Sequence, residues 1–171
     1  MASVELYREI ILDNYKNPLN RRMMKAANAK AMDANPLCGD TVQIMLKIKG
    51  GKVMDASFVG EGCAISIAIA SMLTEWAKGK TEKQLLAMEK GGILEMLGGI
   101  DPGPSRIKCA LLPLKTMKMA IVNMESRKTA GEGKPTKAAG KKFKNSKKSI
   151  FSKSAPSLMR RTTDYKHYRK R

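Results

Sequence analysis

Two neighbouring segments of the chain alternate between polar and apolar residues, the pattern of a β-strand with one buried face. They cover residues 41–48 and 52–59, and Gly50 and Gly51 between them predict a hairpin turn. An antiparallel pair places the beginning of one strand beside the end of the other. The residues just before 41 and just after 59 are therefore expected to be neighbours in space.

Apolar residues spaced by three or four positions predict helices on both sides of this hairpin. The first helix is expected to end near residue 15, with Ser3 as its N-cap. A second helix follows residue 63, and a short third one runs from Thr81 to about residue 89. The last helix is expected to begin at Cys109, with Pro113 in its first turn, where a missing backbone N–H is tolerated. The apolar faces consist of Val4, Leu6, Tyr7, Ile10, Ile11 and Tyr15 in the first helix, Ile65, Ile69, Met72, Leu73 and Trp76 in the second, and Leu111, Leu112, Leu114, Met117, Ile121, Val122 and Met124 in the last.

The remaining segments have the composition of loops. Residues 17–37 contain prolines and several asparagines, and only residues 29–33 among them would fit a short edge strand. Residues 91–104 are rich in glycine and proline, with an apolar patch that suggests one or two helical turns. The expected fold class is α/β (α+β), a small antiparallel sheet with helices packed on it.

The length of 171 residues, 43% of them hydrophobic, suffices for one core, and we expect one domain over residues 1–128. The longest apolar run, residues 64–73, is interrupted by serine and is too short to cross a bilayer. Glu5 and Glu9 interrupt the first helix, where a signal segment would be apolar. We therefore expect a cytoplasmic protein without membrane contact.

The net charge of +18 is distributed unevenly. Residues 130–171 contain 14 lysines and arginines against 2 acidic residues, and glycine, proline and serine are scattered among them. Such a segment is too polar and self-repelling to fold alone, so residues 129–171 are expected to form a basic, disordered tail. Basic clusters such as residues 141–144 would contact nucleic-acid phosphates weakly and without reading sequence, and a purely solubilising tail is the alternative.

Three cysteines, an odd number, argue against a disulfide framework and favour metal or sulfur chemistry. Cys63 lies in the segment Gly60-Glu61-Gly62-Cys63-Ala64-Ile65-Ser66, where a glycine loop meets a helix N-terminus. Unpaired N–H groups at such a terminus stabilise an anion, so we expect a lowered cysteine pKa. A buried structural cysteine is the alternative.

The predicted hairpin brings Cys38 and Asp40, before the first strand, close to Cys63, after the second. Cys109 begins another helix and repeats the arrangement at Cys63. Three thiols and one carboxylate suit one tetrahedral metal site, and cysteine sulfur selects zinc or iron–sulfur chemistry.

Several short motifs follow one another in a specific order along the chain. They are Leu6-Tyr7-Arg8-Glu9-Ile10-Ile11-Leu12-Asp13, Asn17-Pro18, Asn35-Pro36-Leu37-Cys38-Gly39-Asp40, Gly60 to Ser66, Thr74-Glu75-Trp76-Ala77-Lys78-Gly79 and Arg106-Ile107-Lys108-Cys109. Together these motifs resemble the NifU/IscU/SufU-type iron–sulfur assembly scaffolds, and the resemblance covers about residues 4–127.

This resemblance implies a sandwich-like α+β fold and the ligand set Cys38, Asp40, Cys63 and Cys109 for a transient 2Fe-2S cluster or for zinc. It also implies a largely non-enzymatic scaffold that takes sulfur from a cysteine desulfurase and passes clusters to acceptor proteins. SufU-type members act instead as zinc-dependent sulfurtransferases, which relay sulfur rather than build a cluster. The sulfur acceptor would be Cys38, with Cys109 as the second candidate.

Two departures bear on the subtype. IscU-type members carry a histidine before the third cysteine, whereas this chain has Lys108 there, as SufU-type members do. SufU-type members usually have a longer insertion between the second and third cysteines than the 45 residues found here. The chain therefore resembles a SufU-type member with a shortened insertion. Arg106 and Lys108 could favour the thiolate form of Cys109. The alternative is that they are simply two solvated cations on the surface.

Overall fold

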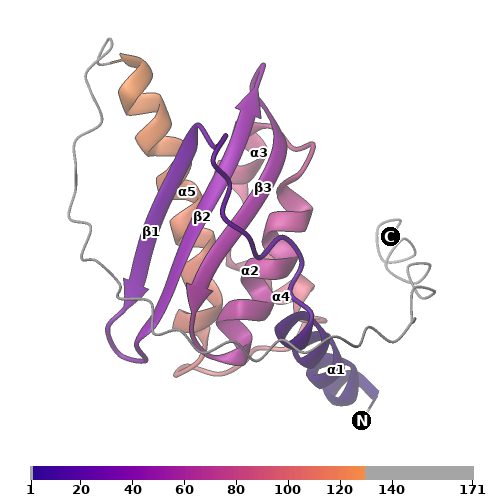
Figure 1. Cartoon of the computed structure of the whole chain (residues 1–171). Helices are drawn as coiled ribbons and strands as arrows, with labels where there is room; N and C mark the ends of the chain where they lie inside the picture. Colours follow the sequence, from indigo (N-terminus) through magenta and orange to yellow (C-terminus); the bar gives the residue numbers. More distant parts are fainter. Residues whose placement is uncertain (1, 130–171) are drawn as a thin grey trace, which may run out of the picture. The chain divides into compact units, whose positions relative to one another are not determined.

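The computed structural model describes residues 2–129, which form a three-stranded sheet and five helices. The basic tail predicted for residues 129–171 falls almost wholly outside this range, and its disorder stays a prediction. The elements in chain order are α1 (Ala2–Lys16), β1 (Ala29–Asn35), β2 (Asp40–Lys49), β3 (Lys52–Glu61), α2 (Ala64–Ala77), α3 (Glu82–Ala87), α4 (Lys90–Met96) and α5 (Ile107–Thr129) (Figure 1).

The sheet has the order β1-β2-β3, and both pairs are antiparallel. The predicted hairpin is confirmed. Gly50 and Gly51 form its turn with φ angles of 58° and 72°, a conformation that glycine adopts at little steric cost. The edge strand considered for residues 29–33 exists and extends to Asn35, where it pairs with Asp40 of β2. The α+β class is therefore confirmed.

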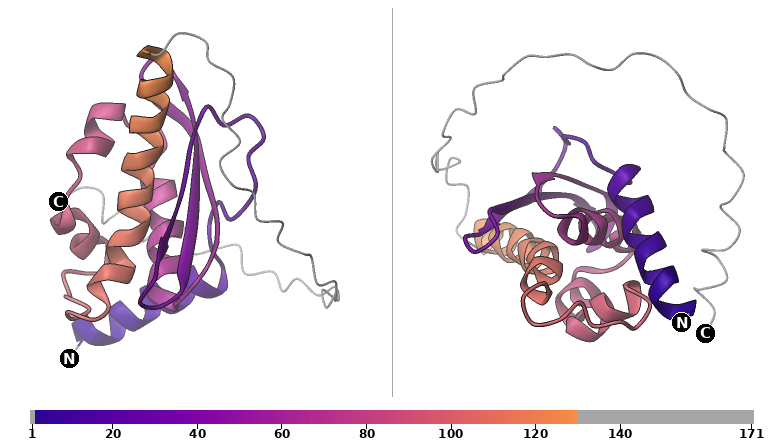
Figure 2. Two further views of the ribbon diagram at one scale, coloured as in Figure 1. Left: turned by 90° about the vertical axis from the view of Figure 1, so that its left-hand side faces the viewer. Right: turned by 90° about the horizontal axis from the view of Figure 1, so that it is seen from below.

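Helices α2 and α5 pack on one face of the sheet, and the segment of residues 17–28 crosses the other (Figures 1 and 2). The hydrophobic core lies between the sheet and the two helices. Met45 faces the crossing segment, and its Sδ accepts a hydrogen bond from Met24 N–H at 3.5 Å. The largest fully buried side chains are Phe58, Ile44, Met45, Leu46, Ile67, Ile69, Leu73, Leu85, Ile93, Leu97, Met117 and Ile121.

Helix α1 packs mainly against α2, and its predicted apolar face is covered only in part. Ile11 is buried, whereas Leu6 and Tyr15 keep 49% and 44% of their surface exposed. The reason is the peripheral position of α1, which is in contact with a neighbouring helix rather than with the sheet. The helix begins at Ala2, so the prediction of Ser3 as its N-cap is wrong.

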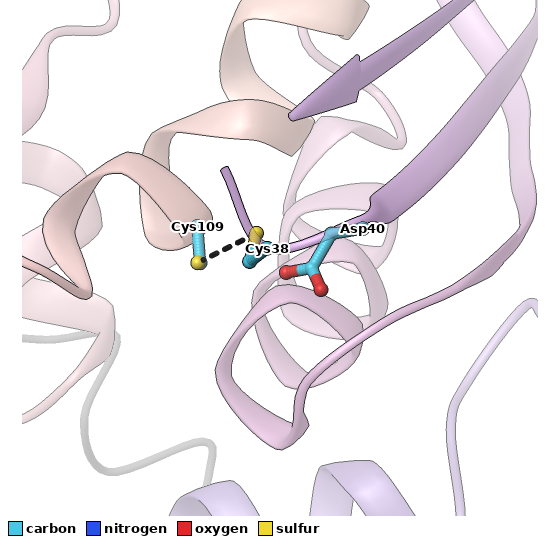
Figure 3. Close-up of side chains that lie close together, drawn as sticks. All are labelled: Cys38, Asp40 and Cys109. Carbon is cyan, nitrogen blue, oxygen red and sulfur yellow. Dashed lines mark hydrogen bonds between the residues drawn. The ribbon is translucent and has the colours of Figure 1, made fainter. Parts of the chain in front are cut away.

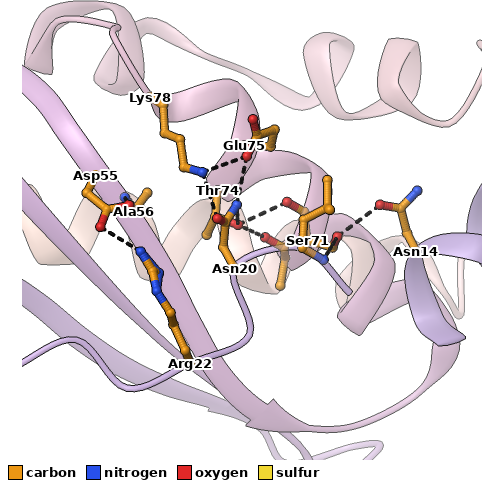
Figure 4. A network of polar contacts seen from close by, with 11 residues as sticks. Asn14, Asn20, Arg22, Asp55, Ala56, Ser71, Thr74, Glu75 and Lys78 are labelled. Atoms are coloured by element: carbon orange, nitrogen blue, oxygen red, sulfur yellow. Dashed lines mark hydrogen bonds and ion pairs between the residues drawn. The ribbon is translucent and has the colours of Figure 1, made fainter. Parts of the chain in front are cut away.

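A network of polar side chains fastens the crossing segment to α2 (Figure 4). Asn20, in the left-handed region at φ 60°, donates to Glu75 Oε2 at 3.0 Å and accepts from Lys78 Nζ at 2.7 Å. Leu19 N–H donates to Ser71 Oγ at 2.8 Å. These bonds hold α2 against the segment that covers the sheet.

Two arginines extend this fastening to β3. Arg21 donates from its guanidinium to the carbonyl of Gly60 at 2.9 Å, and Arg22 forms an ion pair with Asp55 at 2.6 Å. Both arginine contacts are made with β3, the strand that leads to Cys63. The crossing segment therefore holds the end of this strand at Gly60 and its middle at Asp55.

The starts of α2 and α3 agree with the sequence, whereas that of α5, like that of α1, differs. Cys63 is the N-cap of α2, and Thr81 forms a capping box with Gln84 at the start of α3, which ends at Ala87. Helix α5 begins at Ile107, two residues before Cys109, so Pro113 lies in its second turn. There the proline withholds the N–H that would pair with the carbonyl of Cys109.

Val122 of α5 is 50% exposed, so its predicted place on the buried face is wrong. Its neighbours Ile121 and Met124 are buried as predicted.

Within residues 2–129, no helix combines the length and the hydropathy needed to cross a membrane.

A chain shortened to end at Lys128 keeps every residue of the core described above. We expect its free energy of unfolding to stay within about 0.5 kcal/mol of that of the full chain, because the removed segment is too polar to bury much apolar area. Urea unfolding checks this, and a loss above about 2 kcal/mol would contradict a separate tail.

Any nucleic-acid binding of the full chain should fall steeply with salt and disappear on truncation.

Candidate metal centre

The four predicted ligands come from segments that meet at one edge of the sheet. Cys38 lies in the turn between β1 and β2, and Asp40 is the first residue of β2. Thr41 pairs with Glu61, so the end of β3 and the adjoining Cys63 lie beside the start of β2. Figure 3 shows Cys109, from the first turn of α5, next to Cys38 and Asp40.

Three of these ligands form a compact group. The ligand atoms of Cys38, Asp40 and Cys109 all lie within 4.8 Å of one another, and the two sulfurs are 3.3 Å apart. This separation is too long for a disulfide bond of about 2.05 Å. It approaches the roughly 3.8 Å expected for two thiolates on one tetrahedral ion with bonds of about 2.3 Å.

Cys63 stands next to this group and is tied to it through the backbone. Its N–H donates to Asp40 Oδ1 at 3.0 Å, and its sulfur accepts the N–H of Ser66 at 3.5 Å. The predicted position of Cys63 at a helix N-terminus is confirmed. The group of ligand atoms within 4.8 Å of one another does not include its sulfur.

The Asp40 carboxylate supplies the test of whether a metal fits. Asp40 is only 2% exposed, and its Oδ2 is buried without a hydrogen-bond partner among residues 2–129. A buried carboxylate oxygen that lacks a partner costs free energy, which a bound cation would recover. Together with the Cys38 and Cys109 thiols, this oxygen forms a group of two sulfurs and one oxygen, donor types that suit zinc or an iron–sulfur cluster.

The prediction that the helix N-terminus lowers the pKa of Cys63 is wrong for the protein without metal. Burial raises the pKa of Cys63, and Asp40 adds to the increase, although the Ser66 N–H acts in the opposite direction. Burial also raises the pKa of Cys109, and the hydrogen bond with Cys38 and the charges of Cys63 and Asp40 raise it further. Because metal ligands must be thiolates, metal binding here would release protons.

Two glycines make room for the carboxylate. A Cβ on Gly62 would lie 2.7 Å from Cγ and 2.9 Å from Oδ1 of Asp40, and a Cβ on Gly60 would collide with the carbonyl of Thr41. The glycines of the Gly60–Ser66 motif therefore permit β2 and the β3–α2 junction to approach closely.

Arg106 and Lys108 are both exposed, as expected for solvated surface cations.

Asn35 is a residue at the centre that the sequence did not single out for a role. Its side-chain N–H group donates to Cys109 Sγ at 3.8 Å, and its side-chain oxygen accepts Leu37 N–H at 3.1 Å. The available signal was its position before a proline at the end of a strand. No sequence rule connects that position with Cys109.

Comparisons with known proteins agree with this geometry. The zinc-dependent sulfurtransferase SufU of Bacillus subtilis is 38% identical over 136 residues, which cover 70% of this chain and 92% of that protein. The iron–sulfur cluster assembly scaffold protein IscU 1 of Archaeoglobus fulgidus is 34% identical over 118 residues, covering 69% of this chain and 76% of that protein.

Among solved structures, a putative iron–sulfur cluster assembly scaffold protein for the SUF system from Fervidobacterium islandicum has a TM-score of 0.60 and 27% identity. The match covers 68% of this chain and 97% of that one. The NifU-like N terminal domain family matches residues 6–131. With a match over most of its length and relatives above 30% identity, the chain belongs to the NifU-like N-terminal domain family.

Proposed function

We propose that this protein acts in iron–sulfur cluster assembly, accepting sulfur from a cysteine desulfurase and holding metal on Cys38, Asp40, Cys63 and Cys109. The observation that carries the proposal is the buried Oδ2 of Asp40, which has no partner among the described residues 2–129 and lies beside two thiols 3.3 Å apart. The functions of the Bacillus subtilis and Archaeoglobus fulgidus relatives support the same assignment.

Cys38 is the better sulfur acceptor because it is the exposed thiol, whereas Cys109 is only 5% exposed. In the transfer step, the Cys38 thiolate attacks the outer sulfur of a persulfide on the desulfurase. A new S–S bond forms on Cys38 as the S–S bond of the donor breaks. The donor cysteine leaves as a thiolate and takes up a proton equivalent to the one that Cys38 lost, so no external oxidant or reductant is consumed.

An iron–sulfur cluster and a zinc ion both fit the proposed ligands, and each has a specific observation in its favour. A cluster built as cargo would make the protein a scaffold, which the described function of the Archaeoglobus fulgidus relative supports. A resident zinc ion would make it a sulfur relay, which the Bacillus subtilis relative and the Lys108 position support. Zinc would hold the thiolates in their deprotonated form at neutral pH. A nucleic-acid role, which depends on the tail, receives no support from the functions of these relatives.

Metal analysis of the anaerobically purified full chain separates the two candidates. Colourless protein with one zinc per chain supports the relay, whereas brown protein that contains iron and sulfide supports the scaffold. A protein that binds neither metal under these conditions or after reconstitution contradicts both.

Replacing Cys38, Cys63 or Cys109 singly with serine should weaken zinc binding by more than about 100-fold, because losses outside the ligand shell already cost about 10–100-fold. Competition with a chromophoric chelator measures the affinity. Val122→Ser, a change at an exposed position of α5 several turns beyond Cys109, is the control and should leave the affinity unchanged. Wild-type metal content in all three cysteine variants would rule out the ligand set.

Asp40→Ala should slow the loss of an assembled cluster, because the oxygen ligand is the exchangeable position and three thiolates remain. The decay of visible absorption after addition of a chelator or of an acceptor protein measures this rate. Asp40→Asn, which can still accept the Cys63 N–H, shows how much of the effect comes from losing that hydrogen bond. Faster loss of the cluster in Asp40→Ala would contradict an exchangeable role for Asp40.

Gly62→Ala should weaken metal binding although it removes no ligand, because the added Cβ meets Asp40 at 2.7–2.9 Å and displaces its carboxylate. Gly91→Ala in α4 is the matched control, since a Cβ there has open space. Chelator competition together with thermal unfolding measures both variants. Equal zinc affinity in the two variants would argue against a close fit between Gly62 and Asp40.

A further inference from the structure

We propose that Asn35 is a positioning residue of the metal centre, whose side-chain N–H group holds the Cys109 sulfur in place as the retained thiolate ligand. The inference rests on the proposed function, because it assigns a role toward the metal held there. It starts from the bond between Asn35 Nδ2 and Cys109 Sγ at 3.8 Å.

The orientation of the Asn35 amide follows from its other partner. Leu37 N–H, 3.1 Å from the side-chain oxygen, can only donate, so the oxygen must face Leu37. The NH₂ group is thereby directed at Cys109. Because Asn35 is only 8% exposed, water competes little for this donor.

Asn35 also shapes the turn that carries Cys38. Its backbone carbonyl accepts Gly39 N–H at 2.9 Å, and its side-chain oxygen bonds two residues ahead in an Asx-type turn. One residue therefore sets the conformation of the Cys38 turn and contacts the Cys109 sulfur, which belongs to a different element. This link keeps the two sulfurs 3.3 Å apart.

The chemical consequence follows from the charge of the site. Three thiolates and a carboxylate bring four negative charges to one metal site, and a hydrogen bond to a sulfur offsets part of that charge. The Asn35 donor reaches Cys109, which is buried, and leaves Cys38 exposed at the tip of its turn. Asn35 thus favours Cys109 as the ligand that stays and Cys38 as the one free to accept sulfur.

Asn35→Asp separates the two bonds, because aspartate can still accept Leu37 N–H but has no hydrogen to donate to sulfur. We expect the zinc affinity of the full chain to fall by about 10–100-fold, the usual effect of losing an outer-shell partner. With Co²⁺ in place of zinc, the sulfur-to-metal charge-transfer band should move to longer wavelength, because a sulfur without its hydrogen bond donates charge more readily. A looser turn alone would weaken binding without moving the band.

Asn35→Ser serves as a second variant, since it adds no charge and its hydroxyl can still accept Leu37 N–H. It should show the same shift of the Co²⁺ band. If Asn35→Asp does not fold, Asn35→Ser is the variant that is compared with the wild type. Asn28→Asp is the matched control, because Asn28 bridges the N–H and carbonyl of Ile48 at the opposite end of the sheet. Its Co²⁺ band and zinc affinity should equal those of the wild type.

The outcomes separate the inference from the proposed function. Wild-type affinity and an unshifted band in folded Asn35→Asp and Asn35→Ser would overturn the role of Asn35 while leaving the metal centre standing. A wild-type protein that binds neither zinc nor Co²⁺ through its cysteines would overturn the proposed function, and the role of Asn35 with it.

Discussion

The hydrogen bond from Cys63 N–H to Asp40 Oδ1 joins the start of β2 to the start of α2, and the geometry of the metal centre depends on it. One carboxylate oxygen accepts the N–H of Cys63, the N-cap residue of α2, which leaves the other buried without a partner among residues 2–129 and available to a cation. The antiparallel register places the two segments side by side, and Gly62 lets them approach closely enough for the bond to form. The contact that joins the start of β2 to the N-cap of α2 thus also leaves one oxygen open to the proposed metal.

The thiols around this carboxylate differ in how firmly the fold holds them. Cys109 is buried in α5 and bonded to Asn35, Cys63 caps α2, and Cys38 is exposed in a short turn. A site that must release one ligand to receive sulfur benefits from such a gradient, because the exposed thiol can move while the others keep the metal. The crossing segment, through Arg21 and Gly60, adds rigidity on the Cys63 side.

Local patterns in the sequence predicted the hairpin at Gly50, the Thr81 cap and the position of Cys63, because each depends on residues close in the chain. Periodicity identified the apolar stripe of α1 but not whether a neighbour covers it. The raised pKa of Cys63 was missed because burial, a tertiary property, outweighs the helix N-terminus. The bond between Asn35 and Cys109 spans 74 positions and follows only from the packing of α5 on β1.

We have proposed that three sulfurs and one oxygen of this chain bind one metal ion. X-ray absorption at the zinc edge of the zinc-loaded full chain tests this proposal, because the spectrum reports the number and type of ligand atoms. We expect three sulfurs at about 2.3 Å and one oxygen at about 2.0–2.2 Å. A first shell with two or fewer sulfurs, or with only nitrogen and oxygen, would contradict it.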